Sequence, residues 1–187
     1  LMIIFAIFAA LLQPAFAADS TSGAEASRVK ATKLLKEGNH KEAYEIFSRL
    51  TLDPKAEERG VGFDMTTAVH CLWGLNRVAE IDSFREKAIA IHSGNWRLLR
   101  TAADSFLNSS TWQDNYNYNY HNGFEVAGEF RRGQKRGGGK PLNSYEHDRG
   151  RGLQLMVQAM KLVDKTPDAA SFYLDFATIL MGHRQYS

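Results

Sequence analysis

The chain has a single cysteine, Cys71, among 187 residues, so an intramolecular disulfide is excluded. It also has little net charge, because 23 Lys and Arg oppose 21 Asp and Glu, a formal +2 at pH 7. A balance so close to neutral gives no general attraction to nucleic acid or to an anionic membrane surface. The length is sufficient for one domain with its own hydrophobic core.

Spacings typical of catalytic or metal sites are also missing. The sequence contains no Cys-x-x-Cys and no His-x-x-x-His. Residues 146–148 (Glu-His-Asp) are consecutive, and consecutive side chains on a helix point about 100° apart, so they cannot converge on one ion. We therefore predict no catalytic residues, no metal and no cofactor, with Cys71 as a small buried residue. Four histidines are expected at surface or helix-capping positions: His40, His92, His121 and His183.

The N-terminus carries the longest apolar run, residues 1–12, followed by Pro14 and the small-x-small sequence of residues 15–17 (Ala-Phe-Ala). This pattern predicts a signal peptide over residues 1–17, cleaved after Ala17. A membrane span would need about 20 apolar residues. The protein is therefore expected to be exported, periplasmic or extracellular, without a stable membrane anchor. No basic residue precedes the run, so we expect the chain to be incomplete at this end.

Helical periodicity dominates the region that follows. Residues 18–26 are small and polar and are expected to form a flexible linker. From Ser27 to Leu107, apolar residues recur at spacings of three and four, and Gly or Pro separates the segments. This pattern predicts antiparallel helix pairs. The first and last stripes comprise Val29, Leu34 and Leu35, and Leu98, Leu99, Ala102 and Phe106.

One of these pairs, "LLKEGNHKEAYEIFSRLTLDP", resembles a tetratricopeptide (TPR) repeat. Gly38 matches the turn glycine, Ala43 and Phe47 match the small–aromatic pair of the second helix, and Pro54 matches the closing proline. The usual Trp and Leu of the first helix are missing, so an ordinary αα-hairpin is the alternative. The predicted fold is all-α, a TPR-like α-solenoid with one long loop rich in Gly, Tyr and Arg.

That loop is expected over residues 108–143, which is far longer than a normal connection and therefore either functional or disordered. Residues 144–187 then predict a further helical pair, starting from an N-cap at Ser144, and apparently truncated. Its second helix, after Pro167, is expected to turn four side chains inward: Phe172, Phe176, Ile179 and Leu180.

The basic stretch "EFRRGQKRGGGKPLNSYEHDRGR" (residues 129–151) invites a phosphate or RNA interpretation. A phosphate-binding loop fails, because Gln134 stands where glycine is required and Pro141 where Ser or Thr is required. An RNA-binding tail is disfavoured by a single Arg-Gly-Gly and by the export signal.

Two readings of this stretch stay open: a solvated flexible loop, or a loop packed across the helices that contacts a protein. The candidate interaction residues are Tyr116, Tyr118, Tyr120, Phe130, Arg131, Arg132, Arg136 and Lys140. The candidate loop–helix junction residues are Ser144, Asp148, Arg149 and Arg151. Gly150 and Gly152 are expected to weaken the first turn of the helix by about 1 kcal/mol each.

A composite pattern in this part of the chain resembles bacterial alpha-2-macroglobulin-like proteins. The resemblance spans about residues 28–186. The pattern combines Gly128-Glu129-Phe130-x-Arg132-Gly133, the Arg-Gly-Gly-Gly run at 136–139, Ser144, Asp148-Arg149-x-Arg151 and Leu153-Gln154-Leu155. It implies a helical, TPR-like N-terminal region that precedes β-sandwich domains in a large exported protein. The family's implied role is protease trapping or inhibition.

In many members of that family a Cys-x-Glu-Gln motif forms a thioester, but here Leu72-Trp73-Gly74 follows Cys71. We therefore expect a non-catalytic N-terminal region that does not perform the family's activity alone. Its expected partner is a protein, either downstream domains of the same polypeptide or another exported protein. The alternatives are a free-standing exported TPR-like adaptor and a hydrolase whose site has no recognisable motif.

Overall fold

The computed structural model describes residues 15–107, 123–132, 139–142, 144–163 and 167–181. These residues are mostly helical, as predicted, and also contain a small sheet. The helices are α1 (Ala15–Lys36), α2 (His40–Thr51), α3 (Val61–Gly74), the 3-10 helix η1 (Val78–Glu80), α4 (Ile81–Ile91), α5 (Trp96–Leu107), α6 (Ser144–Met160) and α7 (Ala169–Met181). The strands are β1 (Gly123–Val126), β2 (Glu129–Arg132) and β3 (Lys140–Leu142).

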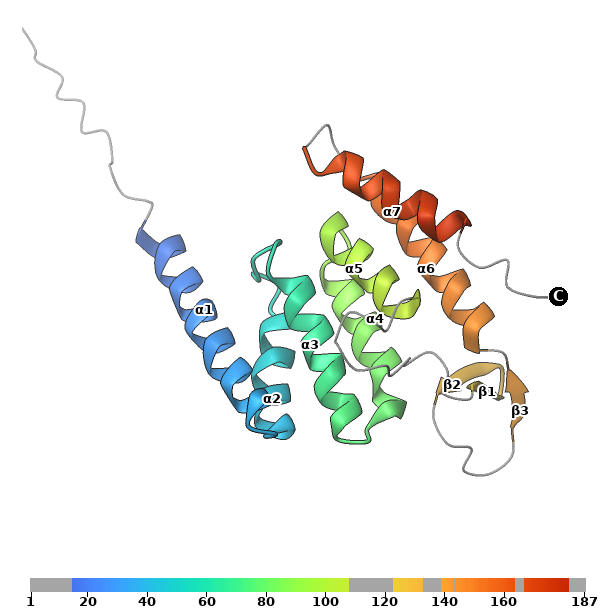
Figure 1. The fold of residues 1–187 in the computed structure, drawn as a ribbon, viewed down its shortest axis with the longest axis horizontal. Coiled ribbons are helices and arrows are strands. Elements are labelled where there is room, and N and C mark those ends of the chain that lie inside the picture. Colours follow the sequence, from blue (N-terminus) through green and yellow to red (C-terminus); the bar gives the residue numbers. More distant parts are fainter. Residues whose placement is uncertain (1–14, 108–122, 133–138, 143, 164–166, 182–187) are drawn as a thin grey trace, which may run out of the picture.

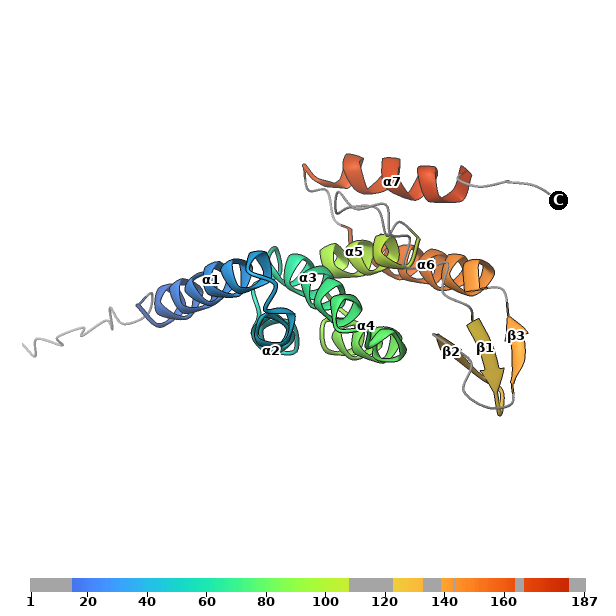
Figure 2. The same cartoon turned by 60° about the horizontal axis from the view of Figure 1, so that its bottom comes forward.

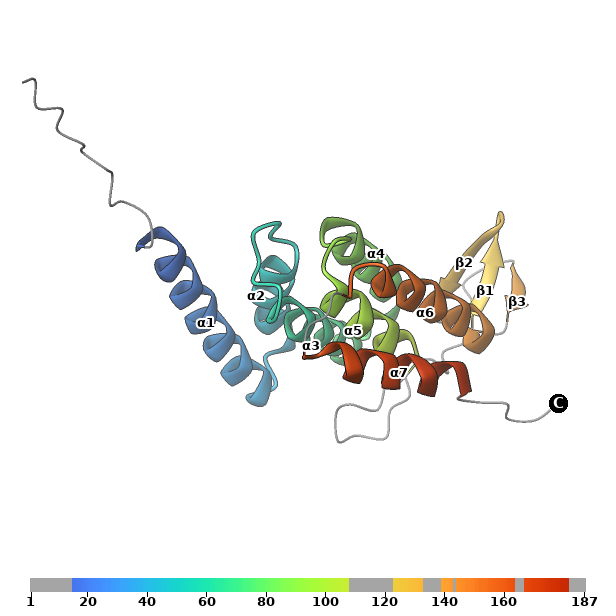
Figure 3. The same ribbon diagram turned by 90° about the horizontal axis from the view of Figure 1, so that it is seen from above.

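The helices follow one another across the molecule in chain order (Figure 1). Figure 2 shows α1, α3 and α5 in one row and α2 and α4 in a second row, with α7 on the side of α5 away from α4. Seen from above, α6 lies beside α5, and the sheet lies at the end of the molecule opposite α1 (Figure 3). Each helix thus packs mainly on its neighbours in sequence.

Left-handed residues end the first and third helices. Gly38 has φ +82°, and the backbone N–H groups of Gly38 and Asn39 donate to the carbonyls of Leu35 and Leu34 at 3.0 and 2.9 Å. These two hydrogen bonds form the Schellman motif, which requires a residue that tolerates positive φ. Asn76, with φ +56°, follows α3 in the same conformation. The predicted helix stop at residues 38–39 is confirmed.

The core lies between the two rows of helices and extends to α6 and α7. Phe47 and Ala43, the pair behind the TPR resemblance, are both fully buried, and Cys71 is buried as predicted. Small residues let the helical backbones approach one another, because a larger side chain would push the helices apart. The fully buried alanines are Ala31, Ala43, Ala68, Ala88, Ala102, Ala103 and Ala159.

Two predicted core residues lie at the surface. Val29 of α1 is 63% exposed and Leu180 of α7 is 55% exposed. Both helices lie at the margin of the packed array, so each has neighbours on only part of its circumference. Apolar periodicity shows that a helix has a buried face, but it does not show how wide that face is.

The structure also differs from the predicted linker. Residues 18–26 lie within α1 and are not a separate flexible segment. Alanine and glutamate are good helix formers, and extending an existing helix avoids the unfavourable nucleation step. The helix therefore continues through these small residues toward the N-terminus.

The predicted 108–143 loop contains a three-stranded antiparallel sheet in the order β2-β1-β3. Ala127 and Gly128 join β1 to β2 with φ +53° and +84°. Positive φ at both turn positions is the type I′ geometry, which matches the right-handed twist of a hairpin. Gly123 pairs with Arg132 on one side and with Leu142 on the other. The prediction of an irregular loop is therefore wrong for these residues.

Candidate functional site

The candidate residues that the structure describes gather where the sheet meets α4 and α6. Phe130, Arg131 and Arg132 lie on β2, and Lys140 lies on β3. The junction candidates Ser144, Asp148, Arg149 and Arg151 all lie on α6, which begins at Ser144. The other four candidates, Tyr116, Tyr118, Tyr120 and Arg136, lie outside the described residues.

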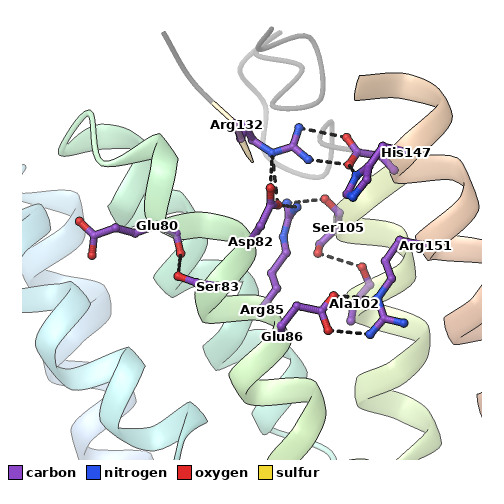
Figure 4. Close-up of polar contacts among 11 residues, drawn as sticks. Glu80, Asp82, Ser83, Arg85, Glu86, Ala102, Ser105, Arg132, His147 and Arg151 are labelled. Atoms are coloured by element: carbon purple, nitrogen blue, oxygen red, sulfur yellow. Dashed lines mark hydrogen bonds and ion pairs between the residues drawn. The ribbon is translucent and has the colours of Figure 1, made fainter. Parts of the chain in front are cut away.

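Arg132 is the centre of this junction (Figure 4). Its Nε donates to both carboxylate oxygens of Asp82 on α4, at 3.0 and 3.2 Å. Its Nη1 and Nη2 donate to the two oxygens of Asp148 on α6, at 3.0 and 2.5 Å. The side chains of Arg132 and Asp148 are only 2% and 1% exposed. One guanidinium therefore ties the sheet to two helices.

The electrostatics favour a charged Arg132. Burial alone would lower the pKa of its guanidinium, but the hydrogen bonds and negative charges of Asp148 and Asp82 outweigh burial and raise that pKa. Two carboxylates in a low-dielectric site stabilise the positive charge more strongly than water would. The guanidinium of Arg132 therefore stays protonated at neutral pH and holds the sheet to the two helices through ion pairs.

A second buried arginine shares the same carboxylate. Arg85 on α4 is 1% exposed, and its Nη1 lies 3.5 Å from Asp82. Its Nη2 donates to the Ser105 carbonyl of α5 at 2.5 Å, and its guanidinium lies 4.6 Å from the centre of the Phe106 ring. Burial lowers the pKa of Arg85 to about 10, so it is still protonated at neutral pH. The Asp82 carboxylate therefore contacts two buried guanidinium groups, those of Arg132 and Arg85.

A further ion pair fixes α6 to α4. Arg151 donates from Nε and Nη2 to the two oxygens of Glu86 at 2.7 and 2.6 Å (Figure 4). Farther along α6, the Gln158 side chain donates to the Ser93 carbonyl at 3.2 Å. Bidentate arginine–carboxylate geometry sets both distance and orientation. These contacts therefore define how α6 lies on the array.

Aromatic stacking covers the buried ion pair. The ring of Phe130 stacks on the imidazole of His147 with centres 3.7 Å apart and planes inclined by 9°. His147 Nδ1 lies 3.1 Å from Asp148, and the Arg132 guanidinium lies 5.3 Å from the Phe130 ring centre. A side chain at Gly123 would come within 2.3 Å of the Phe130 ring. Glycine is therefore needed there to let the ring lie flat.

Two of the four described loop candidates are exposed, and two pack against the helices. Arg131 is exposed and lies 3.5 Å from Glu129, and Lys140 is exposed on β3. Phe130 and Arg132 are engaged with the helices as described above. The Nε of Arg149 is buried without a hydrogen-bond partner in the described part of the chain. Phe130 and Arg132, both predicted interaction residues, therefore contact helices of this chain.

Sequence reasoning missed the partners on α4: Asp82, Arg85 and Glu86. It also missed a similar pair at the other end, where Arg28 of α1 donates to the fully buried Asp64 of α3 at 2.9 Å. In α1, α3 and α4 these charged residues are interspersed with apolar residues, as in any amphipathic helix. The sequence alone does not distinguish a charge facing a buried arginine from a charge facing water.

Four of the six histidines and Cys71 lie among the described residues. His92 caps α2, with Nε2 2.8 Å from the Thr51 carbonyl, as predicted for a capping histidine. His40 is half-buried, whereas His121 and His183 lie outside the described residues. Burial raises the pKa of the Cys71 thiol to about 12, so it is not a nucleophile at neutral pH.

No set of three or more His, Cys, Asp or Glu side chains within the described ranges is placed to hold a metal ion. Of the helices that the structure describes, none has the length and apolar character needed to cross a membrane. Comparison of the chain with family models, with curated proteins and with solved structures found no match.

Proposed function

We propose that this chain is a non-catalytic helical scaffold, the TPR-like N-terminal region of an exported alpha-2-macroglobulin-like protein. The main observation in favour of the proposal is that residues of the macroglobulin-like pattern connect the sheet and α6 to the other helices. Arg132 and Asp148 bind one another, and Arg151 binds Glu86 of α4. Residues that hold two parts of one chain together have a structural role, which fits a scaffold better than a catalytic site.

The energetics of the junction fit a positioning role. Taking Arg132 and Asp148 out of water costs several kcal/mol per ion, and this cost is offset only when the geometry is good. Here all three guanidinium nitrogens of Arg132 have carboxylate acceptors. Such a pair favours one placement of the sheet over all others, because any shift leaves a buried charge without its partner.

Three features support the TPR-like part of the proposal. The helices lie in two rows, α2 packs against both α1 and α3, and Gly38 forms the tight turn between α1 and α2 (Figure 2). Ala43 and Phe47 are buried where α2 meets its neighbours. In such an array each helix pair buries its apolar face against the next pair.

The proposed partner is a protein that covers α7, either downstream domains of the same polypeptide or another exported protein. Tyr173, Leu174, Leu180 and Met181 are exposed along this helix. A contiguous apolar face on a protein surface is typical of an interaction site. The family role of protease trapping belongs, in this proposal, to the whole polypeptide and not to this chain alone.

A second candidate is a free-standing exported adaptor. The observation in its favour is an open groove of about 660 Å³ between α1 and residues 57–63, at the opposite end of the array from the sheet. Grooves of this size are within the range of ligand-binding sites, about 300–1,000 Å³.

The genomic DNA that follows the codon for Ser187 separates the two candidates. A reading frame that continues into β-rich domains is expected if the chain is the N-terminal region of a macroglobulin-like protein. A stop codon, with no further domain, rejects that proposal and leaves the adaptor.

Export is tested independently by fusing residues 1–187 to alkaline phosphatase, which is active only outside the cytoplasm. We expect an active fusion, and an inactive one when residues 1–17 are deleted. Equal activity with and without residues 1–17 would count against a signal peptide.

A further inference from the structure

The groove between α1 and residues 57–63 has one wall built from a single face of α1. The residues on this wall recur at helical spacing: Glu25, Arg28, Val29, Thr32, Lys33 and Lys36. The opposite wall includes Arg59 and Phe63, near the start of α3. At 1.5 Å per residue, the α1 wall is about 16 Å long, equal to about three turns of a helical ligand.

The groove presents two partly exposed apolar side chains. Val29 is 63% exposed and Phe63 is 43% exposed. The Phe63 ring is held edge-on against the buried Phe47, with ring centres 6.0 Å apart. A ligand that covered Val29 and Phe63 would remove apolar surface from water on a preformed site.

The charges around this apolar pair favour an acidic ligand. The two acidic side chains that line the groove, Glu25 and Glu57, both pair with Arg28, at 3.4 and 3.6 Å, and Arg28 also binds the buried Asp64 at 2.9 Å. Lys33 has only a loose, exposed contact with Glu37 at 3.9 Å. Among the described residues, neither Lys36 nor Arg59 forms an ion pair. Three cationic side chains therefore remain for a partner: Lys33, Lys36 and Arg59.

The molecule contains its own example of how this row of helices binds a helix through arginine–carboxylate pairs. On α5, Arg97 pairs with Asp168, the residue before α7, and Arg100 pairs with Asp175 of α7. Between these pairs Phe172 is fully buried, with its ring edge-on to Trp96 at 5.9 Å. The docked helix thus presents one aromatic side chain between two carboxylates on a single face, at i, i+4 and i+7.

The start of the docked segment is close enough to the groove for their charges to interact. The pKa of Asp168 is lowered mainly by its hydrogen bond to Arg97, and Arg59 of the groove contributes to the same effect. The α5 part of the row is covered by α7, whereas no other described helix or strand covers the α1–α3 part, which displays similar side chains (Figure 2).

We propose that the α1–α3 groove binds an acidic amphipathic helix of another protein, with an apolar side chain between two carboxylates. Val29 and Phe63 would receive the apolar side chain, and Lys33, Lys36 and Arg59 would pair with the carboxylates. This is the helix-in-groove mode, in which i, i+4 and i+7 side chains anchor the ligand. The inference rests on the adaptor form of the proposed function but does not require the macroglobulin resemblance.

The test uses the full chain and a fluorescein-labelled synthetic 15-residue peptide, rich in Ala and Glu, that carries Asp, Phe and Asp at the spacing of residues 168, 172 and 175. We expect saturable binding, measured by fluorescence anisotropy, that weakens as salt is added. The triple substitution Val29→Asp, Lys36→Glu and Arg59→Glu should weaken it at least tenfold. The matched control reverses two exposed charges on α2, Lys41→Glu and Arg49→Glu, and should change the affinity less than twofold.

Several results would overturn the proposal. One is no binding to the wild-type chain; another is equal weakening by the groove and control substitutions; a third is equal affinity for a peptide with Asn in place of both Asp. Dimerisation abolished by the groove substitutions, without peptide binding, would assign the groove to a second copy. If the triple variant loses its helical circular dichroism, Lys33→Glu with Lys36→Glu repeats the test on exposed residues. None of these results depends on the DNA beyond Ser187, so the two proposals fail separately.

Discussion

At the scale of single residues, the position of the sheet depends on the charge of Arg132. A guanidinium has five N–H donors and is always charged near neutral pH, so burying it requires carboxylates in a fixed arrangement. Asp82 and Asp148 provide this arrangement from two different helices. The pair is therefore more important for where the sheet lies than for how much stability it adds.

Removing one partner of this buried pair should be strongly destabilising. We expect Asp148→Ala to lower the free energy of unfolding by about 3–5 kcal/mol, because Arg132 would keep a buried charge with one carboxylate instead of two. Replacing both members with apolar residues, Arg132→Met with Asp148→Leu, should restore much of this loss. Urea unfolding followed by circular dichroism measures each value.

An exposed ion pair provides the control. Arg77 and Glu80 are 40% and 48% exposed at i,i+3 spacing, and Glu80→Ala should cost less than about 1 kcal/mol. Equal costs for Asp148→Ala and Glu80→Ala would show that Arg132 is not dependent on its buried partner.

Gly150 and Gly152 of α6 lie in different environments, so the same substitution can be compared at both positions. A methyl group at Gly150 meets nothing within 4 Å, whereas one at Gly152 would come within 2.7 Å of the Leu107 side chain of α5. Gly150→Ala should therefore raise the free energy of unfolding by about 0.5–1 kcal/mol through helix propensity. Gly152→Ala has the same propensity gain but overpacks the α5–α6 contact, which costs about 1–3 kcal/mol.

We expect the Gly152→Ala protein to be at least about 1 kcal/mol less stable than the Gly150→Ala protein. Thermal and urea unfolding of the two variants check this difference. Two equally stable variants would mean that α6 does not approach α5 closely at Gly152.

At the scale of elements, the docking of α7 on α5 combines two ion pairs with one unfavourable carboxylate. Asp104 of α5 faces Asp175 and Arg100. Burial, followed by the nearness of Asp175, raises the pKa of Asp104 to about 6, and Arg100 only partly opposes this. The charged form of Asp104 therefore weakens this contact at neutral pH.

This carboxyl gives stability a defined pH dependence. Because its pKa is about 6 in the folded protein and about 3.9 in the unfolded chain, the folded protein binds more protons between these values. Its contribution to stability therefore rises as pH falls from above 6 to below 4. Asp104→Asn should stabilise the protein at pH 7.5, and this gain should shrink through pH 6 and disappear near pH 4.

Unfolding by urea at a series of pH values measures the difference between wild type and Asp104→Asn. Glu45→Gln, at an exposed position of α2, removes the same charge far from α7 and serves as the control. A gain for Asp104→Asn that stays constant from pH 4 to pH 8 would contradict the assignment.

The same scale explains which elements could be predicted. Helices α2, α3, α4 and α5 each carry an apolar stripe over three turns or more, which is a strong periodic signal. The strands span only 3–4 residues, too few for alternation to be recognised, and their turn is Ala-Gly instead of the usual Asn-Gly. Of the site, Arg132, Asp148 and Arg151 could be proposed from the sequence. Their partners on α4 could not, because contact across 50 residues or more leaves no local pattern.

At the scale of the whole molecule, α7 presents an apolar face at one margin of the array. The exposed fractions on α7 are 68% for Leu174 and 75% for Met181, and these residues lie seven positions apart on the same face. Because apolar surface is unfavourable in water, two such faces should associate when no other protein covers them. The chain on its own is therefore expected to self-associate as its concentration rises.

Leu174→Lys with Met181→Lys should reduce this association, because each lysine places a charge in the contact. Sedimentation equilibrium should show a lower average mass for this variant, and binding of a hydrophobic dye should fall with it. Ile91→Lys, which changes a 40% exposed apolar residue on α4, is the matched control and should associate like wild type. The apolar run at residues 1–12 is common to all three proteins, so the differences between them report on α7 alone. Equal mass for the α7 variant and the control would mean that this face does not drive contact with other molecules.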